Sequence, residues 1–480
     1  MRRTAHALLA ASLLFAADAA SANTAIPDSA VKTAEQLRDK ALADGTAYAV
    51  LQSLTTEVGP RLAGGPNDPR GRDWAVAKFK ALGFDKVYTE PATYPLWVRR
   101  HESGAIVAPF PQRLVLTALG YSPGTPAGGL AAQVVKFDSL DALKAADPAS
   151  VKGKIVYIGF RMQRSRDGHD YGIGAGIREN GPVIAAGKGA AAFILRSAGT
   201  DAHERIAHTG VTGFDPHAPA GSTIPAAALS NPDADQLERE LAYGKPVTVK
   251  LDLDCGIVGT YTGANVIGEI TGSKHPDQVV AIGGHLDSWD PGTGAIDDGA
   301  GVAISMAAAK LIHDLPQRPD RTIRVIAFAN EEMGLWGARA YADKHAKDVA
   351  DFMLGTDSDL GAGKVYRLSA SVKPQARHAI EQIAGVLAPL GVTYDATRPG
   401  GGGSDLGSMH AKGMAALTLD QDATWYFDWH HTSNDTLDKV DPKELAQNVA
   451  VYAAWAYMAA QAQGDFGSAP GAFANDGAEE

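Results

Sequence analysis

The chain has 480 residues, of which 45% are hydrophobic and 21% are charged, and its formal net charge is -11. That length and composition allow a large core and more than one domain of ordinary size. A mildly acidic chain of this kind gives no reason to expect nucleic acid or an anionic membrane as a partner. Because Cys255 is the single cysteine, an intrachain disulfide is excluded, and we expect a buried thiol.

The first 22 residues have the pattern of a secretory signal. Arg2 and Arg3 form a basic start, residues 7–17 are an apolar run, and residues 20–22 (Ala-Ser-Ala) fit a cleavage site. The apolar run is too short for a permanent membrane span, and no later run reaches about 18 residues. The sequence therefore predicts export to the periplasm or the medium, with no membrane association after cleavage. An uncleaved anchor is the alternative.

Residues 23–112 are expected to form the first part of the main domain. Helical patterns cover residues 34–43 and 70–82, and Gly83 ends the second one. Between them, the stretch 59–66 is rich in Gly and Pro and predicts a loop.

Residues 113–255 differ and are expected to form an inserted, mostly β domain. Short apolar runs typical of strands, separated by Gly, Pro and Asp, cover residues 114–119, 134–137, 155–158, 192–195 and 247–253. The segment contains no dense cluster of His, Asp and Glu, so we expect it to lack the chemistry.

Residues 256–463 alternate between strand-like and helix-like segments. Strands are predicted at residues 279–284, 322–329, 353–356 and 415–419, and helices at residues 301–311, 337–344, 374–387 and 442–462. This alternation predicts an α/β fold in which helices flank a mixed sheet. The tail 464–480 is rich in Gly, Ala and Asp and is expected to be disordered.

Five short segments with histidines and carboxylates adjoin these strands. They contain His285 and Asp287, Asp297 and Asp298, Glu331 and Glu332, Asp357 and Asp359, and His430 and His431. Ligand sites in open α/β sheets gather at the carboxyl ends of strands, so these side chains are expected to converge.

Each segment taken alone has an ordinary structural interpretation, such as a surface loop, a helix N-cap, an acidic helix start or a turn. Together they offer two histidines and several carboxylates on one α/β frame. That inventory suits two zinc ions that share a bridging carboxylate.

At these residues the sequence resembles the M28 family of co-catalytic zinc peptidases, and within it the plasma glutamate carboxypeptidase (carboxypeptidase Q) branch. Residues 59–64 (GPRLAG) and 285–290 (HLDSWD) match patterns of that branch. The inserted segment 113–255 resembles the family's protease-associated domain, most clearly at residues 152–156 and 224–226. The resemblance covers nearly all of the chain after the signal. It implies a zinc-dependent exopeptidase fold of the phosphorylase/hydrolase-like type, in which residues 23–112 and 256–463 form one peptidase domain.

The resemblance also implies a set of metal ligands. His285, Asp297 and Asp359 bind one zinc ion, and Asp297, Glu332 and His431 bind the other, so that Asp297 bridges the two. The family pattern further implies a cis peptide bond after the bridging Asp297.

Two further roles follow from the same family pattern. Asp287 orients the first histidine ligand, and Glu331 is the general base. His431 rather than His430 matches the ligand position of the double-histidine segment.

The expected reaction is amide hydrolysis by an exported di-zinc exopeptidase that acts on dipeptides or short peptides. An aminopeptidase acting on longer peptides is the main alternative, and a non-catalytic binding module with a peptidase-like fold is an alternative of another class. A homodimer is a family-level expectation. The inserted domain is expected to cover one side of the cleft and to limit substrate length.

Substrate contacts are less constrained by the sequence. Arg161, Arg164 and Arg398 are candidate cations for a substrate carboxylate. Tyr426 and the glycine-rich segment 400–404 are candidate donors to an oxyanion, although the segment also fits a flexible linker.

Overall fold

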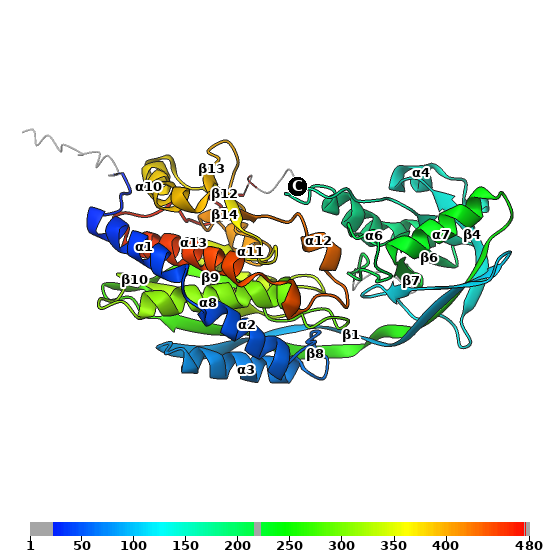
Figure 1. Ribbon diagram of the computed structural model, residues 1–480, viewed down its shortest axis with the longest axis horizontal. Coiled ribbons are helices and arrows are strands. Elements are labelled where there is room, and N and C mark those ends of the chain that lie inside the picture. Colours follow the sequence, from blue (N-terminus) through cyan, green and yellow to red (C-terminus); the bar gives the residue numbers. More distant parts are fainter. Residues whose placement is uncertain (1–22, 216–221, 475, 477–480) are drawn as a thin grey trace, which may run out of the picture.

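The computed structural model describes residues 23–215, 222–474 and 476, which form two lobes joined by a long β ribbon (Figure 1). The ribbon consists of β1 (Lys86–Ala108) and β8 (Thr248–Ile270), which pair antiparallel along their length. The larger lobe is made from both ends of the chain, and the smaller lobe from the residues between the two ribbon strands. The predicted signal, residues 1–22, lies outside the described residues.

The larger lobe is built on a mixed sheet with the strand order β13-β12-β14-β11-β9-β10-β8. Its remaining strands are β9 (His275–His285), β10 (Arg321–Phe328), β11 (Phe352–Asp357), β12 (Val365–Ser371), β13 (Thr393–Tyr394) and β14 (Ala416–Gln421). The central strands β14, β11, β9 and β10 are parallel, whereas β8 and β12 each pair antiparallel with a neighbour in the sheet. The mixed α/β sheet predicted from the sequence is therefore confirmed.

Both faces of this sheet are covered by helices because its central strands are apolar on both sides. In β9, Val280 and Ile282 belong to one buried cluster, and Val279 and Ala281 belong to another. The helices that contribute to the first cluster are α1 (Asp28–Ala41), α2 (Thr46–Glu57), α3 (Asp68–Ala81), α8 (Ala300–His313), α10 (Arg377–Leu387) and α13 (Pro442–Gln461). The second cluster includes side chains of α9 (Trp336–His345) and α11 (Gly407–His410). The chain order alternates strand and helix as predicted, although α2 and β12 were not foreseen.

The smaller lobe carries helices as well as strands. Its strands β4 (Leu130–Phe137), β5 (Ile155–Ile158), β6 (Ala192–Arg196) and β7 (Ala226–Leu229) are parallel neighbours, and β3 (Leu116–Ala118) closes the edge. Its helices are α4 (Leu140–Ala145), α5 (Pro148–Val151), α6 (Tyr171–Gly187) and α7 (Asn231–Ala242). The prediction of a mostly β insert is therefore wrong in its helix content. The expected boundary at residue 255 also falls inside β8, which continues from one lobe into the other.

The described part of the tail differs from the expected disorder. Phe466 is fully buried in the main apolar cluster, and Phe473 stacks on the ring of His410. Next to them, Gln463 pairs with Ala25 in a β-bridge. Composition predicted disorder because glycine and alanine dominate this segment, but two aromatic side chains are enough to anchor it.

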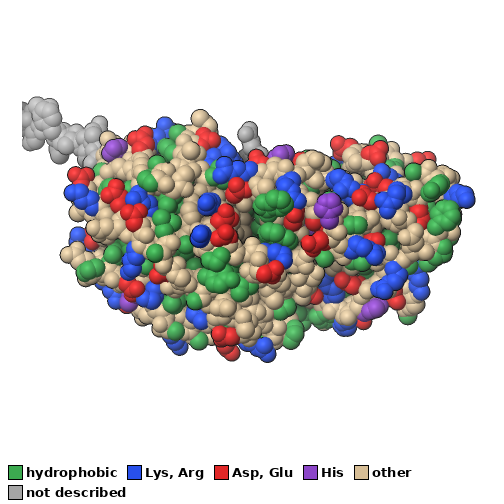
Figure 2. Space-filling model, viewed as in Figure 1, with side chains coloured by type: hydrophobic (Ala, Val, Ile, Leu, Met, Phe, Trp, Pro, Cys, Tyr) green, Lys and Arg blue, Asp and Glu red, His purple; other side chains and the backbone are tan. Residues whose placement is uncertain are grey.

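No helix in the described ranges combines the length and hydropathy of a membrane-spanning segment. On the face drawn in Figure 2, acidic and basic side chains are interspersed over both lobes without a patch of one sign.

Candidate metal centre

The predicted site residues meet at the carboxyl ends of neighbouring parallel strands. His285 ends β9, Glu331 and Glu332 follow β10, and Asp359 follows β11. The double histidine comes after α12 (Tyr426–Trp429), a short helix downstream of β14. Parallel strands that begin at one edge of a sheet end at the opposite edge together, which explains this convergence.

One group of candidate ligands surrounds the Nε2 atom of His285. This nitrogen lies 3.1 Å from Asp297 Oδ1 and 3.4 Å from Asp359 Oδ1. The three ligand atoms lie within 4.8 Å of one another, close enough to share a metal ion.

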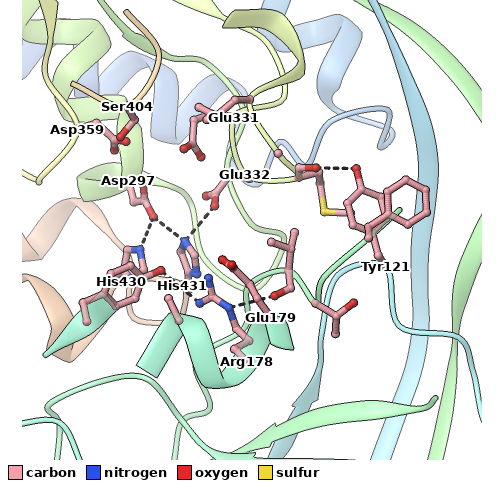
Figure 3. Close-up of a pocket in the computed structure, with 18 of the residues that line it drawn as sticks. Tyr121, Arg178, Glu179, Asp297, Glu331, Glu332, Asp359, Ser404, His430 and His431 are labelled. Atoms are coloured by element: carbon pink, nitrogen blue, oxygen red, sulfur yellow. Dashed lines mark hydrogen bonds and ion pairs between the residues drawn. The ribbon is translucent and has the colours of Figure 1, made fainter. Parts of the chain in front are cut away.

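A second group surrounds the other oxygen of the same aspartate. The Nε2 atom of His431 lies 3.3 Å from Asp297 Oδ2 and 3.0 Å from Glu332 Oε2 (Figure 3). The two carboxylate oxygens of Asp297 therefore face different histidines. This is the arrangement expected of a bridging ligand between two ions.

His430 lies closer to this group than the sequence suggested. Its ring stacks on that of His431 with the centroids 3.5 Å apart, and its Nε2 is 3.4 Å from Asp297 Oδ2. Asp297, His430 and His431 also form a group of ligand atoms within 4.8 Å. Of these two described histidines, His431 lies within ion-pair distance of Glu332 as well, which favours it as the ligand.

The donor set fits divalent metal ions. Asp297 Oδ2 is buried and accepts no hydrogen bond, although it faces two imidazoles. Burial, together with the neighbouring carboxylates, raises the pKa of Glu331 well above its ordinary value and that of Glu332 to about 7. A cluster of buried carboxylates and imidazoles with an open oxygen is what a pair of zinc ions requires.

Asp287 has a different contact from the one predicted. The Nδ1 atom of His285 lies 3.0 Å from the main-chain oxygen of Asp287 and 3.7 Å from its carboxylate, so the backbone is the nearer acceptor. The carboxylate instead accepts a hydrogen bond of 3.1 Å from the main-chain N–H of Glu331. Asp287 thus connects the end of β9 to the segment that carries the predicted base.

Two residues that sequence reasoning did not assign to the site hold its loops. Arg61 is buried and donates to the main-chain oxygens of Leu286, Thr293 and Gly294, which flank the two ligand segments. Asp435 Oδ1 accepts from the main-chain N–H groups of residues 295 and 296, at 2.6 and 2.7 Å. The Gly-Pro-Arg stretch was predicted only as a loop, and nothing in the sequence indicates where its arginine points.

The backbone at the bridging residue agrees with the family pattern. The peptide bond between Asp297 and Asp298 is cis. Asp298 accepts hydrogen bonds from the main-chain N–H groups of His285 (3.1 Å) and Gly301 (2.9 Å), which joins β9 to the start of α8. The carboxylate of Asp298 is therefore used in hydrogen bonds to the backbone, which leaves Asp297 as the candidate ligand of this pair.

A segment of the smaller lobe contacts the double-histidine loop directly. His208 is 1% exposed, and its ring lies 2.7 Å from the main-chain oxygen of His430 and 2.6 Å from Asp201 Oδ1. The next residue, Thr209, donates its N–H to His431 O at 3.0 Å, and its own oxygen lies 3.2 Å from His431 Nδ1. The insert, expected to lack the chemistry, thus supplies groups that support a candidate ligand.

A cavity of about 560 Å³ adjoins the metal centre and lies between the two lobes. One wall includes the candidate ligands Asp297, Glu332, Asp359 and His431, together with Glu331, Ser404 and Tyr426. The smaller lobe supplies the opposite wall through Tyr121, Tyr171, Ala175, Arg178, Glu179 and residues 211–214. The candidate donors Ser404 and Tyr426 therefore line the same cavity as the candidate ligands.

The three arginines named from the sequence lie outside the cavity wall. Arg161 pairs with Asp235, Arg164 lies 2.7 Å from an oxygen of Asp428, and Arg398 lies 3.6 Å from Asp420. The arginines that do line the cavity are Arg178 and Arg339. The sequence could not show which arginines line the cavity, because the cavity forms only where the two lobes meet.

Comparison with known proteins gives consistent matches. Residues 265–456 match the model of peptidase family M28. The chain is 33% identical to carboxypeptidase Q of Bos taurus over 418 residues, which are 87% of this chain and 86% of that protein.

Solved structures extend the comparison. A peptidase M28 precursor from Shewanella amazonensis is 48% identical, with a TM-score of 0.86, covering 90% of this chain and 97% of that chain. An Aneurinibacillus aminopeptidase is 23% identical with a TM-score of 0.61, covering 91% and 98% of the two chains, and shares the fold.

Proposed function

Because this chain belongs to peptidase family M28, and is accordingly a metallopeptidase, we propose that it is an exported di-zinc exopeptidase that hydrolyses dipeptides or short peptides. The observation that carries the proposal is the position of Asp297, whose two oxygens each face a separate histidine. The carboxypeptidase Q relatives favour a substrate with a free C-terminus. The signal pattern of the first 22 residues supports export.

The residues that would hold the metal are those predicted. His285, Asp297 and Asp359 would bind one ion, and Asp297, Glu332 and His431 the other. Zinc at such a site supplies Lewis-acid chemistry for amide hydrolysis and makes a water molecule more acidic.

Glu331 is the proposed general base. Its side chain lines the cavity beside the candidate ligands, and the hydrogen bond from its N–H to Asp287 fixes the segment that carries it. In the forward reaction Glu331 takes a proton from the attacking water and gives it to the leaving amine. Ser404 and Tyr426 are the proposed donors to the developing oxyanion.

The shape of the cavity supports a short substrate. The wall supplied by the smaller lobe stands opposite the candidate ligands, so the space beyond the scissile bond is bounded. An aminopeptidase acting on longer peptides is a second candidate, because the Aneurinibacillus aminopeptidase shares this two-lobed fold over 91% of the chain.

The test compares purified protein on unblocked dipeptides, longer peptides and amino-acyl anilides, with zinc content measured on the same preparations. Hydrolysis of dipeptides with two zinc ions per chain is expected. Preference for anilides and longer peptides would favour the aminopeptidase, and metal-free, inactive protein would favour a non-catalytic binding module. Size-exclusion chromatography with light scattering tests the homodimer expected for the family.

A further inference from the structure

The cavity wall opposite the metal centre contains a buried positive charge without a negative partner. Arg178 lies on α6 and is 5% exposed, and it lines the cavity. No carboxylate of the described residues forms an ion pair with it within 4.0 Å. A buried charge is costly unless it is paired, so an uncompensated guanidinium at this position calls for an anion.

The hydrogen bonds of Arg178 fix its orientation and leave one nitrogen unused. Nε donates to the main-chain oxygen of Val211 at 3.2 Å, and Nη1 lies 3.2 Å from the Tyr171 hydroxyl and 3.3 Å from Thr209 O. Nη2 has no hydrogen bond to any described residue, and the side chain lines the cavity. All three acceptors are uncharged, so they orient the guanidinium without neutralising it.

The nearby acidic groups do not take the place of a partner. Burial opposes the charge of Arg178, but the Tyr171 hydroxyl and the carboxylates of Glu179 and Glu332 raise its pKa, so it stays protonated. Both carboxylates are beyond ion-pair distance, and in the proposed enzyme Glu332 is engaged as a metal ligand. The charge of Arg178 is therefore available to a ligand in the cavity.

We propose that Arg178 binds the free C-terminal carboxylate of the peptide substrate. This inference rests on the proposed peptidase function and specifies its substrate class as peptides with an unblocked C-terminus. A guanidinium held by its own hydrogen bonds forms charge-assisted bonds to a carboxylate at little further cost in entropy. The metal centre and this arginine would then hold the two sides of the scissile bond.

Arg339 is the competing cation. It lies on α9 and also lines the cavity, but its side chain is exposed, so water already stabilises its charge. A solvated arginine gains less from pairing with a carboxylate than a buried one that has no partner.

The test measures kcat/KM for alanyl-leucine and for its C-terminal amide, which share the scissile bond and differ in the carboxylate. The wild-type protein is expected to prefer the free acid. Arg178→Met should reduce that preference roughly 10- to 150-fold, the effect of losing a hydrogen bond to a charged group. The rate of each variant on the amide is the reference against which its rate on the acid is compared.

Three controls accompany this variant. Arg161→Met removes an arginine of the same lobe outside the cavity and should leave the preference unchanged. Arg178→Lys keeps a charge without the guanidinium geometry and should give an intermediate preference. Zinc content and hydrolysis of the amide show whether Arg178→Met is folded, and the preference is a ratio, so a general loss of activity cancels.

The outcomes separate the two proposals. Equal wild-type rates on the acid and the amide would overturn the role of Arg178 and leave the peptidase intact. If Arg339→Met lost the preference for the free acid while Arg178→Met kept it, Arg339 and not Arg178 would be the residue that binds the carboxylate. Wild-type protein that binds zinc but cleaves neither compound would refute the proposed function itself.

Discussion

The two walls of the cavity differ in how they are built. In the metal wall, Glu332 and Asp359 follow the parallel strands β10 and β11 of the mixed sheet, and backbone hydrogen bonding to β9 fixes their relative positions. Asp297 precedes α8, and His431 follows α12. The opposite wall comes from α6 and irregular segments of the smaller lobe, and its position depends on the β1–β8 ribbon and on the contacts of His208 and Thr209 (Figure 1). The comparison suggests that the first wall provides the chemistry and the second provides selectivity and support.

The strongest test of this division removes the bridging ligand. Asp297→Ala is expected to lose zinc and to lower kcat/KM by more than about 10⁴-fold, because it removes ligand atoms from both groups and thereby the water activation. Zinc per chain by mass spectrometry and dipeptide hydrolysis measure the two effects. Asp277→Ala changes an exposed aspartate near the start of β9; it is the matched control and should behave like the wild type.

Two zinc ions retained in Asp297→Ala would contradict the bridging role. Full activity after treatment of the wild type with a chelator would contradict the metal centre as a whole.

The next test separates the base from the ligands on the same wall. Glu331→Gln is expected to keep its zinc and to lose about 10²- to 10⁴-fold in kcat, because the amide cannot accept the proton while the ligand set is intact. The readouts are zinc content and steady-state kinetics on one dipeptide. Turnover at the wild-type rate would refute the assignment of the base.

Much of the metal wall was predictable, because apolar strands and the residues after them are both visible in sequence. The runs at residues 279–284 and 322–329 predicted β9 and β10, and with them the positions of His285 and Glu331. The helices of the insert were harder to predict from the sequence. In α6, Pro182 and several glycines hide the helical pattern. The role of Arg178 depends on how the two lobes meet across a ribbon, and no local pattern encodes that contact.

A third test asks how far the insert supports the metal wall. His208→Ala removes the ring that joins Asp201 to the main-chain oxygen of His430, which precedes a candidate ligand. Loss of such a supporting contact is expected to weaken metal binding by roughly 10- to 100-fold. Competition with a chelator measures the affinity, and His203→Ala, an exposed histidine of the same segment, is the matched control.

If His208→Ala bound zinc as tightly as His203→Ala, the insert would line the cavity without stabilising the metal site. The roles of the two walls would then be more separate than the hydrogen bonds of His208 and Thr209 suggest.

The smallest effect is expected at Cys255, which lies on β8 in a buried apolar cluster shared by the ribbon and the two lobes. This thiol is 8% exposed and shares a buried cluster with Trp97 of the ribbon and with Trp289 and Met333 of the larger lobe. Burial raises its pKa to about 11, so at pH 8 only about one thiol in a thousand is ionised. Labelling of the native protein by iodoacetamide should therefore be slow at pH 8 and become fast in urea, whereas Cys255→Ala should leave kcat/KM unchanged. Rapid labelling of the native protein would instead indicate that the lobes separate readily, and the wall carrying Arg178 would then be too mobile to select a substrate by its carboxylate.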